Sequence, residues 1–312
     1  MAVDKKEKFL YDVSFVVVTY NSDWNEMENT LNSIISQEGI TFEIIIADDG
    51  SKNNYDKELK DYFKTKKILD YTLVLNKKNQ GTVCNLVSGL EKARGEYIKD
   101  ISPGDYLYGK KTLVNWIAYM KKNDLTWSFS DSIYYIQNGP KTKIISAQAH
   151  PNDVKPYLKK DYAECRWNYV VLGDIALGAA MLCKTEVQYH YCKKIINKVK
   201  FAEDNIWRIM MFDGIKTDYY PEYTLLYQFG TGVSTSGSKK WEKLLEMDLK
   251  NADDIIRNTP SEDLDRFQRK LLRGNAWKKN RILKFFVHGK IKSVLYRKYK
   301  VRKTIARLPE EK

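Results

Sequence analysis

Two short runs rich in β-branched residues constrain the fold of this chain most strongly. Residues 14–21 read Ser-Phe-Val-Val-Val-Thr-Tyr-Asn, and residues 42–51 read Phe-Glu-Ile-Ile-Ile-Ala-Asp-Asp-Gly-Ser, so each apolar run ends abruptly in polar turn residues. Between them apolar residues recur at spacings of three and four, and Asp23, followed by Glu26, could cap a helix there. Because strands buried on both faces read as continuous apolar runs, the pattern predicts a strand–helix–strand unit of a parallel sheet.

The same alternation of strand and helix continues along the first hundred residues. Strands are expected at 71–75 and 95–101, and a helix is expected to open after the turn at 79–82. We therefore predict an α/β fold. Ligands of such open sheets bind outside the carboxyl ends of the strands, so the polar residues at 19–21 and 48–49 are candidates for a site.

The second half of the chain is less regular. The stretch 126–145 has a mixed pattern, and 150–168 lacks clear periodicity and is interpreted as a mobile or substrate-facing loop. A helix is expected from about Thr185, and one or two strands are expected within 217–228. After Lys239 the pattern is helical throughout.

The positive charge of the chain is concentrated near its C-terminus. Sixteen Lys and Arg and no Asp or Glu lie between Arg266 and Pro309, which leaves 37 of the 53 basic residues against all 40 acidic residues elsewhere. The main body is thus close to neutral, which argues against nucleic-acid binding there. No apolar run reaches the roughly 18 residues of a membrane span, no secretory segment is visible, and the four cysteines lack metal-ligand spacing. We expect a cytoplasmic protein with reduced thiols.

Four blocks of sequence, taken in order, carry a resemblance to a known family. They are 18–21 (Val-Thr-Tyr-Asn), 48–51 (Asp-Asp-Gly-Ser), 95–105 (from Gly-Glu-Tyr-Ile to Gly-Asp) and the pair Glu203–Asp204. The chain resembles the family-2 glycosyltransferases, inverting enzymes of the GT-A fold, over roughly residues 13–236. The resemblance implies a Rossmann-like, mixed and mostly parallel sheet flanked by helices, and a nucleotide-diphospho sugar as the donor.

A nucleotide needs a pocket that recognises the edge of its base. The carboxylate of Asp49 could accept the N3–H of uracil, with the ring of Tyr20 against the base. The structural alternatives are that Asp49 only caps its own turn and that Tyr20 only packs at a strand end. Further candidates for binding the nucleotide sugar are Thr19, Asn21, Gly104, Asn79, Gly81 and Asn85. The last three could instead serve as turn formers and helix caps.

The diphosphate leaving group carries charge that a divalent cation neutralises as a Lewis acid, and hard oxygen ligands suit Mg²⁺ or Mn²⁺. The resemblance implies an acidic loop after the strand at 95–101. Here residues 102–105 read Ser-Pro-Gly-Asp, so Asp105 is the predicted metal ligand, with a plain turn residue as the alternative. Asp100 lies outside the family pattern, and we expect it to face elsewhere on the strand.

An inverting transfer is a single displacement in which the acceptor hydroxyl group loses its proton to a base. By resemblance Asp204 is the predicted catalytic base, and Glu203 orients nearby groups. The structural alternative is that two acids at a helix start complement the helix dipole. Trp207 and Arg208 are expected to brace the helix rather than bind substrate.

Together these residues predict a hexosyl- or N-acetylhexosaminyl-transferase that moves a sugar from a UDP-sugar to a glycan or lipid-linked oligosaccharide. The resemblance implies that this enzyme acts in bacterial surface-polysaccharide synthesis. The reduced acidic loop suggests a non-catalytic nucleotide-sugar-binding protein as one alternative, and a sugar nucleotidyltransferase is another. The latter calls for a glycine-rich, basic phosphate loop after the first strand, which residues 19–22 do not supply.

We expect a GT-A domain over 1–238, divided into a nucleotide-sugar half at about 13–108 and an acceptor half at 109–238. A helical, basic region over 239–312 follows. From Trp277 onward basic residues interleave with apolar and aromatic ones, a pattern typical of a segment on an anionic membrane surface. Packing of the apolar stripe on the body is the alternative. These features predict peripheral binding at the inner face of the plasma membrane, and the C-terminal region could also form a homodimer surface.

Overall fold

The structure is a computed structural model that describes residues 9–138, 141–149, 151, 153–232 and 238–258. Its elements in chain order are β1 Tyr11–Thr19, α1 Trp24–Ile35, β2 Phe42–Asp48, α2 Asp56–Lys66, β3 Tyr71–Leu75, α3 Thr82–Leu90, β4 Gly95–Ile101, β5 Tyr106–Leu107, α4 Thr112–Lys122, β6 Trp127–Asn138, β7 Lys141–Ala149, α5 Lys155–Leu158, α6 Tyr162–Arg166, the π-helix η1 Trp167–Leu172, the 3₁₀ turn η2 Gly178–Ala180, β8 Met181–Lys184, α7 Thr185–Ile195, α8 Asn205–Phe212, β9 Thr217–Gln228 and α9 Lys239–Asn258.

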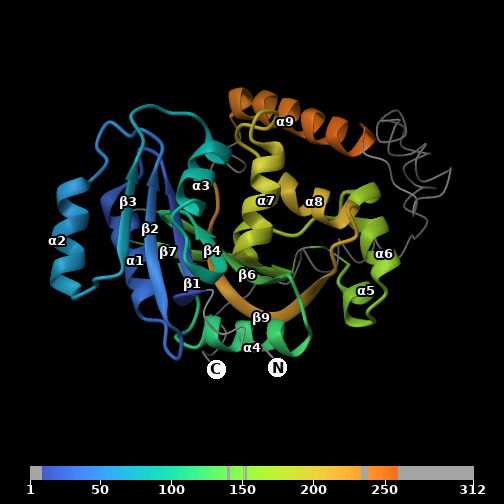
Figure 1. Ribbon diagram of the computed structural model, residues 1–312, viewed down its shortest axis with the longest axis horizontal. Coiled ribbons are helices and arrows are strands. Elements are labelled where there is room, and N and C mark those ends of the chain that lie inside the picture. Colours follow the sequence, from blue (N-terminus) through green and yellow to red (C-terminus); the bar gives the residue numbers. More distant parts are fainter. Residues whose placement is uncertain (1–8, 139–140, 150, 152, 233–237, 259–312) are drawn as a thin grey trace, which may run out of the picture.

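A mixed sheet organises these elements (Figure 1). Its strand order is β3-β2-β1-β4-β8-β6-β9-β5, and β7 pairs with β6. The first four strands are all parallel, with Val16 of β1 level with Ile45 of β2 and Asp100 of β4. β8 runs antiparallel to both β4 and β6, and β6 and β9 are again parallel. The predicted α/β fold with a mixed sheet is confirmed.

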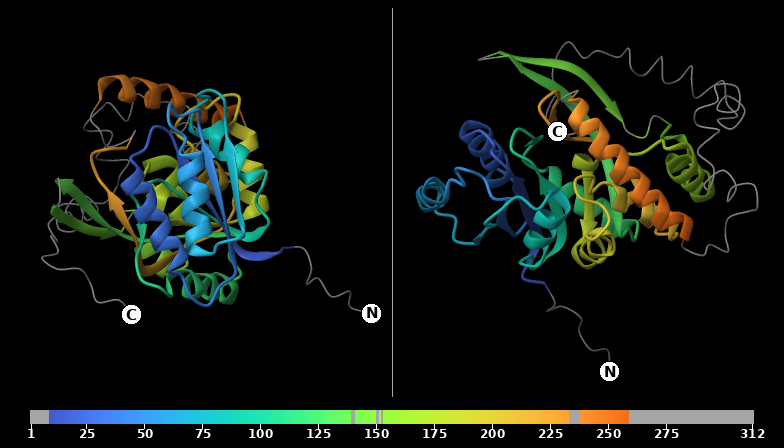
Figure 2. Two further views of the ribbon diagram at one scale, coloured as in Figure 1. Left: turned by 90° about the vertical axis from the view of Figure 1, so that its left-hand side faces the viewer. Right: turned by 90° about the horizontal axis from the view of Figure 1, so that it is seen from above.

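The pleat of the central strands explains why their sequences read as unbroken apolar runs. On β1, Val13, Phe15 and Val17 face the side covered by α1, α2 and α4, whereas Val16 faces α3, α7 and α8. All four side chains are fully buried. Helices cover both faces of the sheet (Figures 1 and 2), so residues of both parities must be apolar.

The start of α1 forms as its sequence predicts, with one difference. Oδ1 of Asp23 accepts hydrogen bonds from the backbone N–H groups of Asn25 (2.8 Å) and Glu26 (3.3 Å). The Glu26 carboxylate does not turn back to the cap but accepts from Nε2 of Gln228 at 2.7 Å. Glu26 therefore ties α1 to the end of β9.

The prediction of a loop over 150–168 is wrong within the described residues. This stretch contains α5, α6 and the start of η1, and none of its described residues lines the cavity discussed below. Helices of four and five residues are too short to show a helical period in sequence. The mixed pattern at 126–145 corresponds to the β6–β7 hairpin.

Helix α9 lies across α7 and α8 (Figure 1) and fixes the chain ahead of α8. The buried carboxylate of Asp248 accepts backbone N–H bonds from Lys200 (3.0 Å), Phe201 (2.6 Å) and Ala202 (3.0 Å). Arg208 of α8 also forms an ion pair with Asp253 of α9. The basic segment from Arg266 to Pro309 lies outside the described residues. Among those described, no helix has the length and apolar character needed to cross a membrane.

Candidate active site

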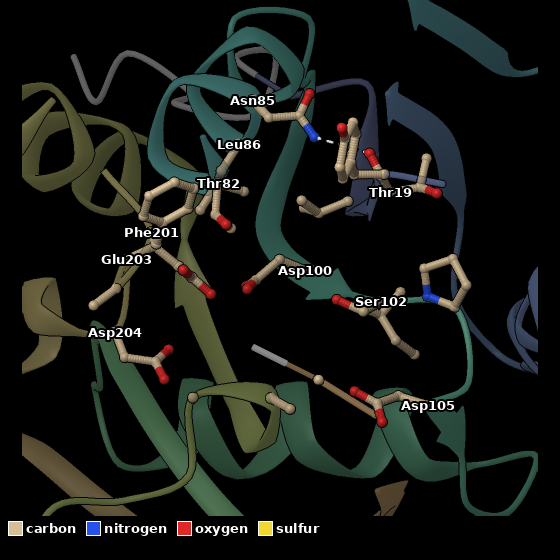
Figure 3. A pocket seen from close by; sticks show the side chains of 18 of the residues that line it. Thr19, Thr82, Asn85, Leu86, Asp100, Ser102, Asp105, Phe201, Glu203 and Asp204 are labelled. Carbon is tan, nitrogen blue, oxygen red and sulfur yellow. Dashed lines mark hydrogen bonds between the residues drawn. The ribbon is translucent and has the colours of Figure 1, made fainter. Parts of the chain in front are cut away.

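A cavity of about 950 Å³ opens at the carboxyl ends of β1, β2 and β4. Its wall also includes the segment before α8, the segment around η2, the end of β9 and one side of α9 (Figure 3). The cavity brings together most of the residues predicted from sequence, namely Thr19, Tyr20, Asn21, Asp49, Asn79, Asn85, Asp105, Glu203 and Asp204. Gly81 and Gly104 are not part of its wall.

The two adjacent aspartates at the end of β2 make different hydrogen bonds. Asp48 caps the turn, because Ser51 donates to it from its backbone N–H (2.9 Å) and from its hydroxyl group (2.5 Å). Asp49 instead accepts the backbone N–H groups of Gln80 (2.8 Å) and Gly81 (2.9 Å). The alternative that Asp49 only caps its own turn is therefore wrong, since it joins the end of β2 to the loop before α3.

Other predicted residues hold this edge of the sheet in place. Buried Asn85 donates from Nδ2 to the carbonyl oxygen of Ala47 at 2.7 Å, so its side chain links α3 to β2 and does not cap a helix. Thr19 donates to the hydroxyl oxygen of Ser22 at 2.8 Å, and Oδ1 of Asn21 accepts the N–H of Lys52 at 3.0 Å. The side chains that this edge exposes to a ligand include Tyr20, half of whose surface is accessible, Asn21 and Asn79.

Gly81 and Gly104 are required by backbone geometry. Both have φ of 96°, a conformation that side chains disfavour. A Cβ on Gly81 would meet the carbonyl oxygen of Lys200 at 2.7 Å, and one on Gly104 would meet Oε1 of Gln228 at 2.1 Å. Gly81 shapes the loop that Asp49 binds, Gly104 shapes the loop that carries Asp105, and their own contribution to ligand binding stays a prediction.

Asp105 is 6% exposed and points into the cavity from the loop after β4 (Figure 3). Its Oδ1 accepts the backbone N–H of Gln228 at 3.0 Å. Burial raises the pKa of Asp105 to about 7, against the opposing effects of this hydrogen bond and of Lys99. Among the described residues no three acidic, histidine or cysteine side chains are grouped around one point. One carboxylate still fits a Mg²⁺-type ion that takes its other ligands from diphosphate and water.

Glu203 and Asp204 project from the start of α8 toward the middle of the cavity (Figure 3). Burial, and then the neighbouring Asp204 charge, raise the pKa of Glu203 well above its ordinary value. Desolvation inside the cleft, followed by the charge of Asp100, raises the pKa of Asp204 to about 7. The raised pKa of Glu203 favours its neutral form, whereas Asp204, with a pKa of about 7, can gain or lose a proton near neutral pH, as a general base requires.

The position of Asp204 depends on a glycine in η2. A Cβ added to Gly178 would lie 1.7 Å from Oδ1 and 2.2 Å from Cγ of Asp204. No side chain at position 178 could leave this carboxylate where it is. The Asp204 side chain therefore rests directly on the backbone of η2.

Asp100 contradicts the expectation drawn from sequence. Its side chain does not face elsewhere but lines the cavity, between Ser102 on one side and Glu203 on the other (Figure 3). Asp100 shares its strand face with Ile98, which packs toward α3 and α7. The pleat of β4 could have revealed this, because residues two apart point to the same face.

Trp207 and Arg208 brace α8, as predicted. The Trp207 ring stacks on Trp127 of β6 with ring centres 5.2 Å apart. Arg208 is buried, donates to the carbonyl oxygen of Val170 at 3.2 and 3.1 Å and pairs with Asp253. The guanidinium is therefore committed to protein acceptors although the residue borders the cavity.

The outer wall of the cavity is apolar. It is formed by Ile175, Leu177, Phe201, Trp241, Leu245 and Leu249. Trp241 of α9 meets Phe201 edge-on with ring centres 5.1 Å apart. Ile175 and Leu249 are 47% and 46% exposed. Trp241, Leu245 and Leu249 recur every four residues along α9, but no sequence pattern relates them to Phe201 or to the 175–177 segment.

Residues 14–155 match the sequence model of Glycosyl transferase family 2. Three of the four sequence blocks lie within the match, and Glu203–Asp204 lies beyond it. A relative from Methanocaldococcus jannaschii is 24% identical over 222 residues, which cover 69% of this chain and 70% of the relative. One from Haemophilus influenzae is 26% identical over 228 residues, 72% of this chain and 67% of the relative. Both are described as uncharacterized glycosyltransferases.

Two solved structures show the same fold. S. aureus TarS 1-349 in complex with UDP-GlcNAc superposes with a TM-score of 0.55 at 17% identity, covering 91% of this chain and 78% of that one. The mannosyltransferase PcManGT from Pyrobaculum calidifontis, in complex with GDP-Man and Mn²⁺, superposes with a TM-score of 0.58 at 13% identity, covering 94% and 84%. At these identities the likeness concerns the fold.

The contact between Gly178 and Asp204 predicts a variant that loses activity and keeps its fold. Gly178→Ala should displace the Asp204 carboxylate, and a displacement of about 1 Å can cost on the order of 100-fold in rate. Because the displaced group is the end of a side chain, the melting temperature should change little. Sugar-nucleotide turnover and thermal melting measure the two effects.

Gly173→Ala is the matched control. Its Cβ would meet nothing within 4 Å, but its φ of 70° disfavours alanine. This variant should lose stability and keep its turnover. If Gly178→Ala kept full turnover, the placement of Asp204 against η2 would have no catalytic importance.

Proposed function

This chain belongs to glycosyl transferase family 2 through residues 14–155, and we propose that it transfers a sugar from a UDP-sugar to an acceptor hydroxyl group with inversion of configuration. The observation that carries the proposal is that one cavity joins the nucleotide-side residues Tyr20 and Asp49 to Asp204, whose pKa is about 7. Solved structures of the same fold that bind UDP, UDP-GlcNAc or GDP-Man with Mn²⁺ support a nucleotide-sugar donor.

The donor is proposed to lie along the carboxyl ends of β1, β2 and β4. Its base lies against Tyr20, near Asp49, whose two oxygens already hold the 79–81 loop through backbone amides. Asn79 is exposed at the same edge. The diphosphate then extends past Ser102 toward Asp105, which places the sugar between Asp100 and Asp204.

The transfer is a single displacement. The acceptor oxygen bonds to the anomeric carbon as the bond from that carbon to the diphosphate oxygen breaks, so the nucleoside diphosphate leaves with the bonding electron pair. Asp204 takes the proton of the acceptor hydroxyl group. Glu203, which precedes Asp204 at the start of α8, orients the groups around this base.

Neutralising the leaving diphosphate is the main electrostatic demand on this cavity. Seven carboxyl groups line it, from Asp23, Glu26, Asp49, Asp100, Asp105, Glu203 and Asp204, and Arg208 is the one basic residue among the described lining residues. Since Arg208 is committed to Val170 and Asp253, a divalent cation fits the demand, with Asp105 as its protein ligand. When bound, such a cation supplies Lewis-acid stabilisation of the leaving group.

The acceptor is proposed to reach Asp204 along the apolar wall that Phe201 and Trp241 begin. Aromatic faces of this kind suit the C–H faces of a sugar, and the aliphatic residues beyond them suit an apolar carrier. A glycan or lipid-linked oligosaccharide acceptor fits both, and the transferred group is proposed to be a hexosyl or N-acetylhexosaminyl group. The division at residue 238 stays a proposal, because α9 carries residues of this wall. Membrane binding by the segment after Trp277, a homodimer and a role in surface-polysaccharide synthesis are proposals as well.

Removing the proposed base should remove a distinctive pH dependence. Asp204 acts as a base only when ionised, so turnover should rise with pH through about 7 and level off above it. Asp204→Asn should lower turnover by about 10²- to 10⁴-fold and abolish this rise. Release of UDP from UDP-GlcNAc, followed from pH 5.5 to 9, measures both.

Asp213→Asn makes the same substitution at the opposite end of α8 and is the control. There the carboxylate pairs with Lys194 at 2.7 Å, away from the cavity wall. This variant should keep the wild-type profile. Wild-type turnover in Asp204→Asn would refute the assignment of the base.

The cation should bind together with the nucleotide. UDP should raise the melting temperature of the protein by several degrees more with Mn²⁺ than with EDTA, because a ligand that binds only the folded state stabilises it. Asp105→Asn should lose the Mn²⁺-dependent part of the shift and keep the rest, because an Asn oxygen can still accept the N–H of Gln228. Equal UDP shifts with Mn²⁺ and with EDTA in the wild type would contradict the cation's role.

A further inference from the structure

We propose that Asp100, held in place by Gln188, selects uncharged sugars and excludes donors whose sugar bears a carboxylate. The inference rests on the proposed function, since it names the class of sugar that this cavity accepts. It assigns a specificity-determining role to a residue of β4 that lies outside the sequence pattern of the nucleotide-sugar site.

The first observation is the place of Asp100 within the cavity. It is half-buried near the carboxyl end of β4 and points into the space between Ser102, next to the proposed diphosphate position, and Glu203 (Figure 3). The transferred sugar must span this space, because its anomeric carbon has to reach both the diphosphate and the base Asp204. A sugar in transit therefore passes within reach of the Asp100 carboxylate.

The second observation is the support given to Asp100 by α7. Gln188 is 1% exposed and donates from Nε2 to Oδ1 of Asp100 at 3.0 Å. The other amide atom of Gln188, Oε1, is buried and has no hydrogen-bond partner among the residues that the structure describes. An unpaired buried acceptor costs free energy, so packing alone does not account for the buried amide of Gln188. Its hydrogen bond fixes the direction of the Asp100 carboxylate.

The third observation is that the side-chain cations near the sugar position are already bound to protein acceptors. Lys99, the neighbour of Asp100, is fully buried and donates from Nζ to the carbonyl oxygens of Asp100 (2.6 Å) and Ala179 (2.7 Å). It lies on the opposite face of β4 and does not line the cavity. Among the described lining residues the basic side chain is Arg208, which is held by Val170 and Asp253.

A carboxylate on the donor sugar would thus meet Asp100 and Asp204 without a free side-chain cation to pair with. A hydroxyl group in the same place can donate a hydrogen bond to Asp100. Asp100 therefore repels the carboxylate and attracts the hydroxyl group, and this difference discriminates between sugars of the same shape.

The test compares UDP-glucose with UDP-glucuronate, which differ in a CH₂OH group against a carboxylate. Binding of UDP, UDP-glucose and UDP-glucuronate to the full chain is measured by calorimetry with Mn²⁺. The wild type should bind UDP-glucose about tenfold or more tightly than UDP-glucuronate, because like charges repel in a cavity of low polarity. Asp100→Asn should bring the two affinities within about threefold of each other by relieving that repulsion.

Two further variants test whether the ratio of the two affinities depends on Asp100 itself or on any change of charge or structure in the cavity. Gln188→Met, which releases Asp100, should narrow the ratio of the two affinities while UDP binds as in the wild type. Asp23→Asn removes a carboxylate from the cavity wall and keeps the helix cap, since Asn caps as well as Asp, and should leave the ratio unchanged.

The binding measurements test the role of Asp100 separately from the nucleotide site. Equal affinities for the two sugars in the wild type, or an unchanged ratio in Asp100→Asn, overturn the role of Asp100 while UDP binding upholds the nucleotide site. Absence of UDP binding itself refutes the proposed donor and this inference with it. Because the wild-type ratio needs no variant, a failure of Asp100→Asn to fold still leaves a result that can overturn the proposal.

Discussion

Desolvation of carboxylates in a cavity with almost no positive charge is the constraint on which this structure depends. Limited solvation by the surrounding protein raises the pKa of Asp105, which is buried, and of Asp204, which is open to the cavity, each to about 7. The pKa of Glu203 is raised well above its ordinary value by the same cause and by the adjacent Asp204 charge. Such groups favour their neutral forms until a cation or a hydrogen-bond donor arrives. A nucleotide sugar that brings a divalent ion relieves the penalty, so the free protein is arranged for the complex rather than for its own stability.

The remaining structure keeps these acids at their places with backbone groups. Asp49 holds the 79–81 loop through two amides, and Asp248 of α9 holds the residues ahead of Glu203 through three. Gly178 gives Asp204 a surface with no side chain in the way. Charge-assisted bonds from backbone amides are strong and directional, and they do not add side-chain cations that would quench the acids.

Much of the nucleotide half could be predicted from sequence because its elements are local. Strands β3 and β4 begin and end at the predicted residues, and Asp23 caps α1 as expected, since apolar runs and caps act over a few residues. The β6–β7 hairpin escaped prediction in part because Ser128, Ser130 and Ser132 are buried on β6, which breaks the apolar pattern of a buried strand. Ser128 accepts the indole N–H of Trp116 at 2.6 Å, a partner that sequence spacing does not reveal.

The site residues also divide into those that a local sequence signal reveals and those set by long-range contacts. Asp49 was found because topology brings strand ends together, whereas Asp105 and Asp204 were found through the family resemblance. Asp100 was misplaced because its position was judged by the spacing of a motif and not by the pleat it shares with Ile98. The apolar wall that includes Phe201 and Trp241 depends on the docking of α9, a long-range contact with no local signal.

The account's central claim is a single displacement assisted by Asp204, and the configuration of the first product tests it most directly. UDP-glucose carries its sugar in the α configuration, and slow hydrolysis by the enzyme needs no knowledge of the natural acceptor, because water takes its place. Time-resolved proton NMR of the released sugar should show β-glucose first, before mutarotation produces the α anomer, at a rate that Asp204→Asn abolishes. Release of α-glucose first would contradict the claim.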